Sequence, residues 1–479
     1  MTRMASRTTK ASITCNACDP AASDTRKELQ MAASKSKMNV WQLTILTAVN
    51  MMGSGIILLP AKLAEVGTVS IFSWLITAGG SLALAYAFAR CGMLSKKPGG
   101  MGGYAEYAFG KGGNYMANYT YGLSLVIGNV AIGVTAVGYG TVLFGTSLTP
   151  IQTCIWTIIL LCLTTFANFG GAQITGRIGS VTVWGVIIPT IVISIIGWFW
   201  FSAGTYAAAW NPHDLPFMTA VGSAISITLW AFLGLESACA NADAVENPER
   251  NVPIAVLGGT IGAAIIYIVS TNVIAGIVPN ADLAASSAPF GLAYATMFNA
   301  TVANIVTGLM VVACIGSLLG WQFTVAQVFK SSADVGYFLP VFGKATAIGV
   351  PIIGMLILLA AQLALALMTI SPELNEQFGR VVNLAVVTNL VPYVMSMAAL
   401  ITIQNVSGVP RGKALLTNII AMIATIYSFY ALWSSGTEAI MLGGLCIFLG
   451  WTLFGFVSAR FYRMEVAAHV ANPGKSLQA

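Results

Sequence analysis

The sequence predicts an all-α, polytopic membrane protein with twelve transmembrane helices. We expect a five-plus-five inverted repeat in which the first and sixth helices are broken. Three observations favour this fold: an apolar composition, regularly spaced charge-free runs, and two glycine-interrupted spans. The 479 residues are 57% hydrophobic and only 8% charged, whereas a soluble protein carries roughly 25% charged residues.

Eleven charge-free runs are long enough to cross a bilayer, which takes about 20 apolar residues. The run 112–176 can hold two helices with a break near Thr149 and Pro150, so we expect twelve spans. The runs are 38–61, 66–89, 112–176, 178–213, 215–235, 251–281, 283–329, 345–372, 381–410, 414–437 and 439–459.

The basic residues indicate how the chain is oriented. With twelve spans and an internal N-terminus, only Lys62 and Arg380 of the 22 Lys and Arg residues fall outside. This distribution satisfies the positive-inside rule and predicts that both termini are cytoplasmic. No compact basic patch remains once these loops are assigned, so no nucleic-acid partner is expected. The lipid bilayer is the expected surrounding.

The cysteines and histidines give no support to a metal site or a cofactor. Cys15 and Cys18 form a lone C-x-x-C in a polar tail with no second pair near them. The only histidines are His213 and His469, in predicted loops or tails. We therefore expect no metal, no cofactor and no enzymatic activity. The tail itself is expected to be disordered, and Met31 or Met38 could be the true start.

The first predicted span, 39–61, is interrupted near its middle. It contains Asn50, and then Gly53, Ser54 and Gly55. Glycines around a serine at that depth free backbone groups, which is tolerated where the backbone lines a cavity or is buried in protein. Close helix packing through small residues is the alternative explanation.

The sixth predicted span, 218–241, carries a carboxylate, Glu236, with apolar residues on both sides. A charge at that depth is costly and needs a partner or a water-filled cavity. Gly234 offers a place to interrupt the helix, and Trp230 offers an aromatic face to a cation. The pattern predicts a cation site in which substrate and proton compete for Glu236.

The two broken spans indicate an internal repeat. The stretch around Gly103–Ala108, expected as a short helix at the interface, is echoed by Pro289–Ala295, and each follows the second helix after a break. An inverted-repeat transporter predicts this correspondence. The expected organisation is a tail (1–37), spans 1–5 (38–205), spans 6–10 (218–405), two further helices (411–460) and a cytoplasmic tail (461–479).

Long motifs then identify a resemblance. GSGIILLP in the first span, WAFLGLE in the sixth and NPERNVP after it resemble the amino acid–polyamine–organocation transporter family, and the match extends from residue 38 to about 460. GGMGGYAEYAFGKGGNYMANYTYG and SLLGWQFTVAQVFKSS are most similar to the bacterial putrescine–ornithine antiporters of that family.

The resemblance implies a substrate site between the two broken helices. It implies that the Gly53–Gly55 break binds an α-carboxylate and that Trp230, Glu236, Trp321 and Tyr121 lie at the site. It also implies exchange of putrescine for ornithine across a bacterial inner membrane, with proton-coupled putrescine uptake as a second mode. A lysine–cadaverine or arginine–agmatine exchanger stays open, because one methylene is worth only about 1–3 kcal/mol. A cation channel is a remoter alternative, and the oligomeric state is left undetermined.

Overall fold

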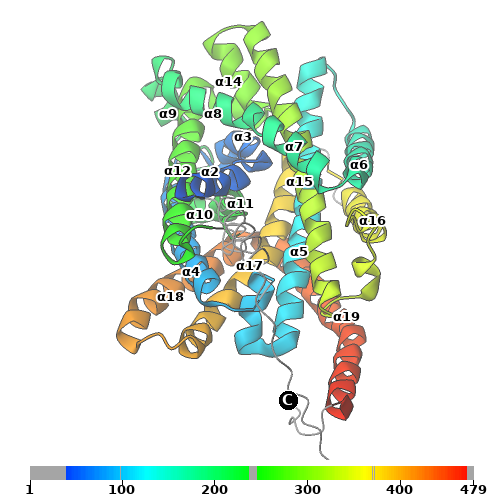
Figure 1. Cartoon of the computed structure of the whole chain (residues 1–479). Helices are drawn as coiled ribbons and strands as arrows, with labels where there is room; N and C mark the ends of the chain where they lie inside the picture. Colours follow the sequence, from blue (N-terminus) through cyan, green and yellow to red (C-terminus); the bar gives the residue numbers. More distant parts are fainter. Residues whose placement is uncertain (1–38, 98, 237–244, 369, 372, 472–479) are drawn as a thin grey trace, which may run out of the picture.

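The structure is a computed structural model that describes residues 39–97, 99–236, 245–368, 370–371 and 373–471. The predicted N-terminal tail, with Cys15 and Cys18, lies outside the described residues. The structure is 83% helical, which confirms the all-α prediction. Figure 1 shows its helices gathered into one bundle.

The helices follow one another closely along the chain. Up to residue 230 they are α2 (Val40–Met51), η1 (Ser54–Ile56), α3 (Leu59–Val66), α4 (Ser70–Leu94), α5 (Met101–Phe144), α6 (Pro150–Ala167), η2 (Asn168–Gly170), α7 (Ala172–Thr182), α8 (Trp184–Ile196), η3 (Gly197–Phe199), α9 (Ala203–Ala208), α10 (Phe217–Ser223) and α11 (Ile225–Trp230). After residue 245 they are α12 (Pro248–Ile277), α13 (Asn280–Ala284), α14 (Pro289–Met297), α15 (Ala300–Asp334), η5 (Pro340–Gly343), α16 (Ile352–Met368), α17 (Leu374–Val406), α18 (Arg411–Ser434) and α19 (Gly436–Ala471).

The described part of the chain forms a multi-pass membrane protein. Nine of its helical segments are long and apolar enough to cross a bilayer. Three shorter apolar helices, Val40–Met51, Phe217–Trp230 and Ile352–Met368, lie where the first, sixth and ninth spans are expected. The three shorter helices are not long enough to be identified as spans by length and composition alone. Twelve crossings and the inverted repeat therefore stay predictions.

The first predicted span is broken where its glycines indicate. The helix α2 begins with a capping box, in which the Asn39 side chain accepts from the Gln42 backbone amide at 2.9 Å. The same helix ends at Met51, the 3-10 turn η1 follows, and α3 resumes at Leu59. Glycine and serine at this point leave the backbone free to depart from the helix.

The sixth predicted span is also interrupted. The helix α11 ends at Trp230 and residues 231–236 form turns. Gly234 has φ +110°, a conformation that residues with a Cβ rarely adopt. Residues 237–244, which the sequence assigns to the rest of this span, lie outside the described residues.

The two breaks lie against each other. A methyl group added to Gly55 would lie 3.4 Å from the Ala231 Cα, and one added to Gly234 would lie 3.0 Å from the Asn50 carbonyl oxygen. Glycine at Gly55 and Gly234 therefore lets the two interrupted backbones approach closely. This contact brings two segments nearly 180 residues apart in the sequence to one place.

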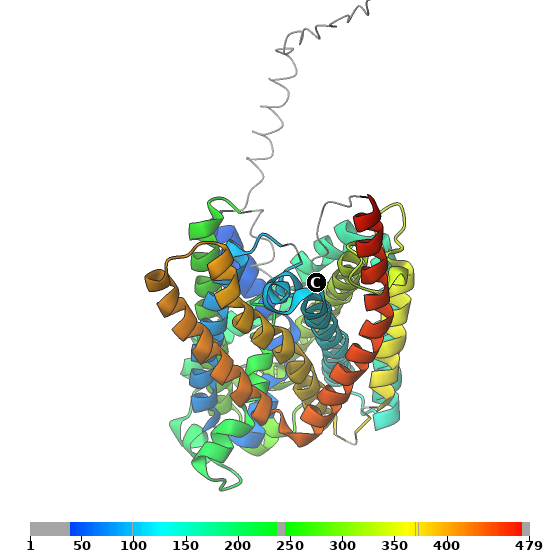
Figure 2. The same ribbon diagram turned by 90° about the horizontal axis from the view of Figure 1, so that it is seen from below.

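Two long helices run through the centre of the bundle beside these breaks. In α5 and α17, 72% of the most apolar stretch of the helix is buried inside the protein, whereas in α19 only 17% of the corresponding stretch is buried. Figure 2 shows α18 and α19, in orange and red, on the outer side of the bundle. Helices of similar apolar composition thus differ sharply in how much of their surface is buried in the bundle.

Several helix boundaries differ from the sequence-based expectation. The stretch around Gly103–Ala108 is helical, as expected: α5 consists of two helices that meet at a kink at Gly110, whose backbone is non-helical (φ +62°). The charge-free run that begins at residue 178 was expected to hold the fifth span, whereas α7 begins at Ala172, because a helix continues through the charged Arg177. The helix α19 continues to Ala471, beyond residue 460 where the last span was expected to end.

Candidate functional site

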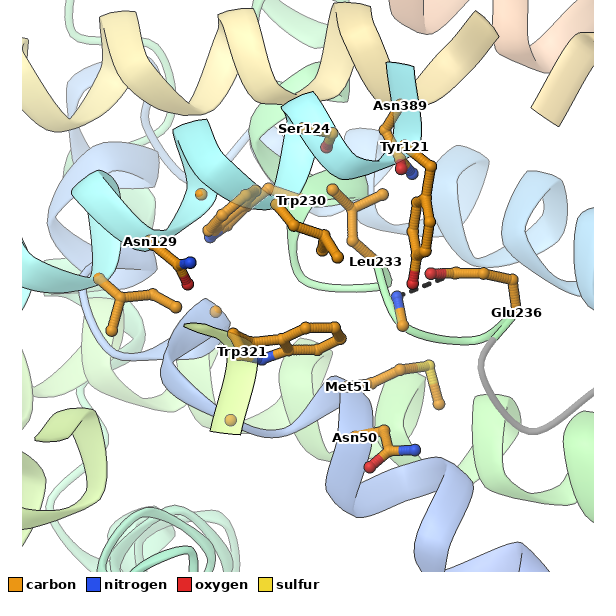
Figure 3. A pocket seen from close by; sticks show the side chains of 16 residues that line it. Asn50, Met51, Tyr121, Ser124, Asn129, Trp230, Leu233, Glu236, Trp321 and Asn389 are labelled. Atoms are coloured by element: carbon orange, nitrogen blue, oxygen red, sulfur yellow. Dashed lines mark hydrogen bonds between the residues drawn. The ribbon is translucent and has the colours of Figure 1, made fainter. Parts of the chain in front are cut away.

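A cavity lies where the two helix breaks meet the central helices (Figure 3). It contains about 510 Å³ of space, its opening to solvent included. The lining residues come from both breaks and from α5, α15 and α17. They are Asn50, Met51, Gly53, Gly55, Tyr121, Ser124, Leu125, Gly128, Asn129, Ile132, Trp230, Leu233, Gly234, Glu236, Trp321 and Asn389.

The cavity brings together eight of the nine residues that the sequence nominated for the site. They are Asn50, Gly53, Gly55, Tyr121, Trp230, Gly234, Glu236 and Trp321. The ninth, Ser54, belongs to η1 in the same break, and its side chain is outside the described part of the structure. That these residues bind a substrate is still a prediction, because lining a cavity does not establish binding.

Glu236 is the buried carboxylate of the cavity. Its exposed fraction is 5%, and it is the only Asp or Glu among the buried residues that the structure describes. Its Oε2 accepts hydrogen bonds from the Tyr393 hydroxyl at 2.6 Å and from the Gly234 backbone amide at 3.1 Å. The Tyr121 side chain points toward the same carboxylate (Figure 3).

The surroundings of Glu236 are suited to a positively charged ligand. The residues that line the cavity include no Lys and no Arg. The described hydrogen bonds to the carboxylate come from neutral donors, which orient the group without neutralising its charge. A buried carboxylate with neutral donors only is a strong attractor for a cation in a low-dielectric site.

Two tryptophans form apolar walls of the cavity. Trp230 is 9% exposed and its benzo ring packs on α5, since a methyl group at Gly128 would lie 3.0 Å from the indole Cη2. Trp321 extends from α15 across the cavity, and its Cη2 would lie 3.6 Å from a methyl group at Gly234. Figure 3 shows both rings between Glu236 and the opposite end of the cavity. Such faces can hold an ammonium group or an alkyl chain.

The end of the cavity opposite Glu236 is polar. Asn129 is fully buried there, and neither its Nδ2 nor its Oδ1 has a hydrogen-bond partner among the described residues. The indole Nε1 of Trp230 is likewise buried and unpartnered in the described part of the chain. Buried polar groups are normally satisfied, so these groups indicate a place for a polar part of a ligand.

Sequence reasoning missed four polar residues of this region: Ser124, Asn129, Asn389 and Tyr393. Three of them line the cavity, and Tyr393 holds Glu236. A signal was available for the two asparagines, because an amide in the middle of an apolar span is costly and commonly functional. No sequence signal separates Tyr393 from other tyrosines, since its role depends on how α17 packs.

No group of three or more His, Cys, Asp or Glu side chains that could hold a metal ion occurs among the residues that the structure describes. The cavity contains a single carboxylate and no histidine or cysteine. The lining residues provide a carboxylate, aromatic faces and glycine backbone for binding.

An apolar helical bundle with a cavity at two helix breaks is the architecture of a membrane transporter of small molecules. The sequence profile of the family described as "Amino acid permease" matches residues 38–467, and the chain belongs to that family. The chain is 66% identical over 429 residues to the putrescine transporter PotE of Escherichia coli strain K12, which covers 90% of this chain and 98% of that protein.

Two further relatives extend the comparison. The putrescine transporter PotE of Haemophilus influenzae is 64% identical over 431 residues, or 90% of this chain and 99% of that protein. A cadaverine/lysine antiporter of Escherichia coli strain K12 is 35% identical over 425 residues, or 87% of this chain and 93% of that protein. Both similarities span nearly the whole of each relative.

Proposed function

We propose that this protein is a secondary transporter that carries putrescine across a bacterial inner membrane in exchange for ornithine. The observation that carries the proposal is Glu236, a buried carboxylate in a cavity without a basic residue. The high identity to proteins named putrescine transporters supports the choice of substrate. Both termini are proposed to be cytoplasmic, from the distribution of Lys and Arg.

The chemistry of putrescine fits the cavity from end to end. Putrescine is a short alkyl chain with an ammonium group at each end. One ammonium group would pair with Glu236, the chain would lie between Trp230 and Trp321, and the other ammonium group would reach the amide oxygen of Asn129. Cation–π contact and charge pairing would supply the affinity.

Ornithine can use the same cavity in a different way. It shares the side-chain ammonium group and adds an α-amino group and an α-carboxylate. Backbone N–H groups at the Gly53–Gly55 break are suited to the carboxylate, because an interrupted helix presents unpaired donors there. Ornithine carries a net charge of +1 and putrescine +2, so exchange would respond to the membrane potential as well as to both gradients.

A lysine–cadaverine exchanger is the second candidate, favoured by the 35% identity to a cadaverine/lysine antiporter. The test is uptake of radiolabelled putrescine into proteoliposomes preloaded with ornithine, lysine, arginine or buffer alone. We expect saturable uptake that internal ornithine stimulates most. Stimulation by internal lysine alone would support the second candidate. Uptake that does not saturate and does not depend on any internal amino acid would contradict exchange and indicate a channel.

A proton-coupled mode of putrescine uptake is part of the proposal, because substrate and proton would compete for Glu236. Because the proton and the diamine would occupy Glu236 in turn, they would cross in opposite directions, so an outward proton gradient applied to proteoliposomes without an internal amino acid should drive putrescine uptake. Uptake that is unaffected by the gradient or by its collapse would remove this mode and leave exchange alone.

A further inference from the structure

The indole N–H of Trp230 is a hydrogen-bond donor with no acceptor among the described residues. The side chain is 9% exposed and its Nε1 is buried. In Figure 3 this nitrogen and the Asn129 amide face the same end of the cavity, across from Glu236. The fully buried Asn129 amide is a second unpartnered polar group at this end, so this end of the cavity is polar.

The orientation of the indole is set by its neighbours. Its benzo edge packs on α5, where a methyl group at Gly128 would lie 3.0 Å from Cη2 and 3.4 Å from Cζ3. Its nitrogen faces the first helix break, where a methyl group at Gly55 would lie 3.8 Å from Nε1. Because Gly128 has no side chain, the benzo edge can pack directly on α5. Because Gly55 has none, the space beside the indole N–H stays open.

The two polar groups at this end differ in what they can bind. The amide of Asn129 carries donors and an acceptor, so it can serve an ammonium group or a carboxylate. The indole nitrogen is a donor only, whatever its surroundings. A ligand without an acceptor leaves the Trp230 donor buried and unpartnered, which costs free energy.

This difference separates the two proposed substrates. Putrescine is ornithine without its carboxylate, and at neutral pH its only polar groups are two ammonium donors. We infer that the Trp230 indole N–H determines specificity for the amino acid by donating a hydrogen bond to its carboxylate beside the Gly55 break, and contributes no hydrogen bond to the diamine. The inference rests on the proposed exchange of a diamine for an amino acid.

The test compares ornithine and putrescine as competitors of labelled putrescine in proteoliposomes, for the natural protein and for Trp230→Phe. The variant keeps an aromatic face and loses the N–H. We expect the ornithine inhibition constant to rise roughly tenfold or more, the range of a lost hydrogen bond to a charged group. The putrescine constant should rise less than about threefold.

The matched control is Trp321→Phe, which removes an indole from another wall of the same cavity. Nε1 of Trp321 is not among the buried unpartnered atoms of the described residues, so this variant should change both constants by similar factors. Equal changes for both substrates in Trp230→Phe would overturn the inference and reduce Trp230 to a packing surface.

A second variant keeps the test valid if Trp230→Phe does not fold. Gly55→Ala keeps the indole and puts a methyl group 3.8 Å from its Nε1 and 3.4 Å from the Ala231 Cα of the other break. It should also weaken ornithine more than putrescine, and an equal loss would count against the inference. Ornithine that does not compete at all with putrescine in the natural protein would instead overturn the proposed exchange, a different outcome from a missing split in the variant.

Discussion

At the scale of single residues, the site depends on a carboxylate held by neutral donors. Tyr393 from α17 and the Gly234 amide from the second break both bond to Oε2 of Glu236. These donors come from two elements, so the position of the carboxylate is tied to how the break packs on α17. A cation bound at Glu236 would therefore contact a group whose orientation is fixed in advance, which lowers the ordering cost of binding.

Trp321 provides a residue-scale prediction about the aromatic wall. If its face holds an ammonium group, Trp321→Phe should weaken putrescine binding mildly and Trp321→Leu should weaken it far more. Cation–π contacts are worth about 0.5–2 kcal/mol and are stronger with tryptophan than with phenylalanine, whereas leucine makes none. Binding of labelled putrescine to the purified variants measures this. Equal losses in the two variants would favour lost volume over cation–π contact.

The sequence could predict those site residues whose type is unusual within an apolar membrane span. Glu236 in an apolar span and the glycines around Ser54 are such residues, because each breaks the pattern of a membrane helix. Asn389 and Tyr393 could not be assigned in this way. Their contact with the cavity or with Glu236 depends on the rotation of α17 in the bundle, which the apolar pattern of a span does not encode.

At the scale of elements, the cavity lies where two interrupted helices pass close to each other. Gly234→Ala should reduce transport at least about tenfold while the protein still inserts. The residue has φ +110°, which strains a residue with a Cβ by about 1–3 kcal/mol. A methyl group would also lie 3.0 Å from the Asn50 carbonyl oxygen. Initial rates of putrescine exchange at equal membrane levels measure the effect.

The matched control for this prediction is Gly79→Ala in α4. A methyl group at Gly79 meets nothing within 4 Å, and alanine is favoured over glycine within a helix. This variant should transport as well as the natural protein. Near-normal exchange by Gly234→Ala would show that the second break does not need its observed backbone conformation.

A single hydroxyl connects the first break to α14. Tyr139 is fully buried, donates to the Ile57 carbonyl at 2.9 Å and accepts from the Phe290 amide at 3.3 Å. Tyr139→Phe removes both bonds and keeps the ring. Since this side of the cavity is the predicted outside, the variant should open the cavity more often to external reagents.

The measurement is the rate at which an external, membrane-impermeant thiol reagent labels Ile132→Cys, a cavity position, in a background without other cysteines. We expect faster labelling in Tyr139→Phe. Tyr294→Phe is the control, because Tyr294 donates to the Pro189 carbonyl at 2.8 Å and makes no hydrogen bond to the break among the described contacts. Unchanged labelling in Tyr139→Phe would mean that its hydroxyl does not hold the outer side closed.

At the scale of the whole molecule, composition predicted the class of fold and the placement of most helices. Thr149 and Pro150 mark the start of α6 as expected, since a capping residue and proline suit a helix N-terminus. Composition did not predict that α5 and α17 are the central helices. Their runs are as apolar as those of α18 and α19, and only packing separates buried from lipid-facing helices.

The distribution of Lys and Arg predicts the orientation of the bundle. Lys96, between α4 and α5, and Ala281, in α13, are both exposed and lie in loops predicted on opposite sides of the membrane. Single cysteines at these positions, in a cysteine-free background, should be labelled from opposite sides by an impermeant reagent. Labelling of both from the same side would contradict the topology.

Glu236 is proposed to bind the cationic end of the substrate. Glu236→Gln keeps the shape of the side chain and loses the charge, whereas Glu65→Gln, the control, removes a carboxylate that pairs with Lys62 outside the cavity. The most direct measurement is the putrescine affinity of each purified protein across pH.

We expect the affinity of the natural protein and of Glu65→Gln to fall on acidification, because a protonated carboxyl group no longer pairs with an ammonium group. Glu236→Gln should bind putrescine at least about tenfold more weakly, as expected for a lost charge-assisted bond, and without that pH dependence. Near-normal affinity of Glu236→Gln with an unchanged pH profile would contradict the account of the site.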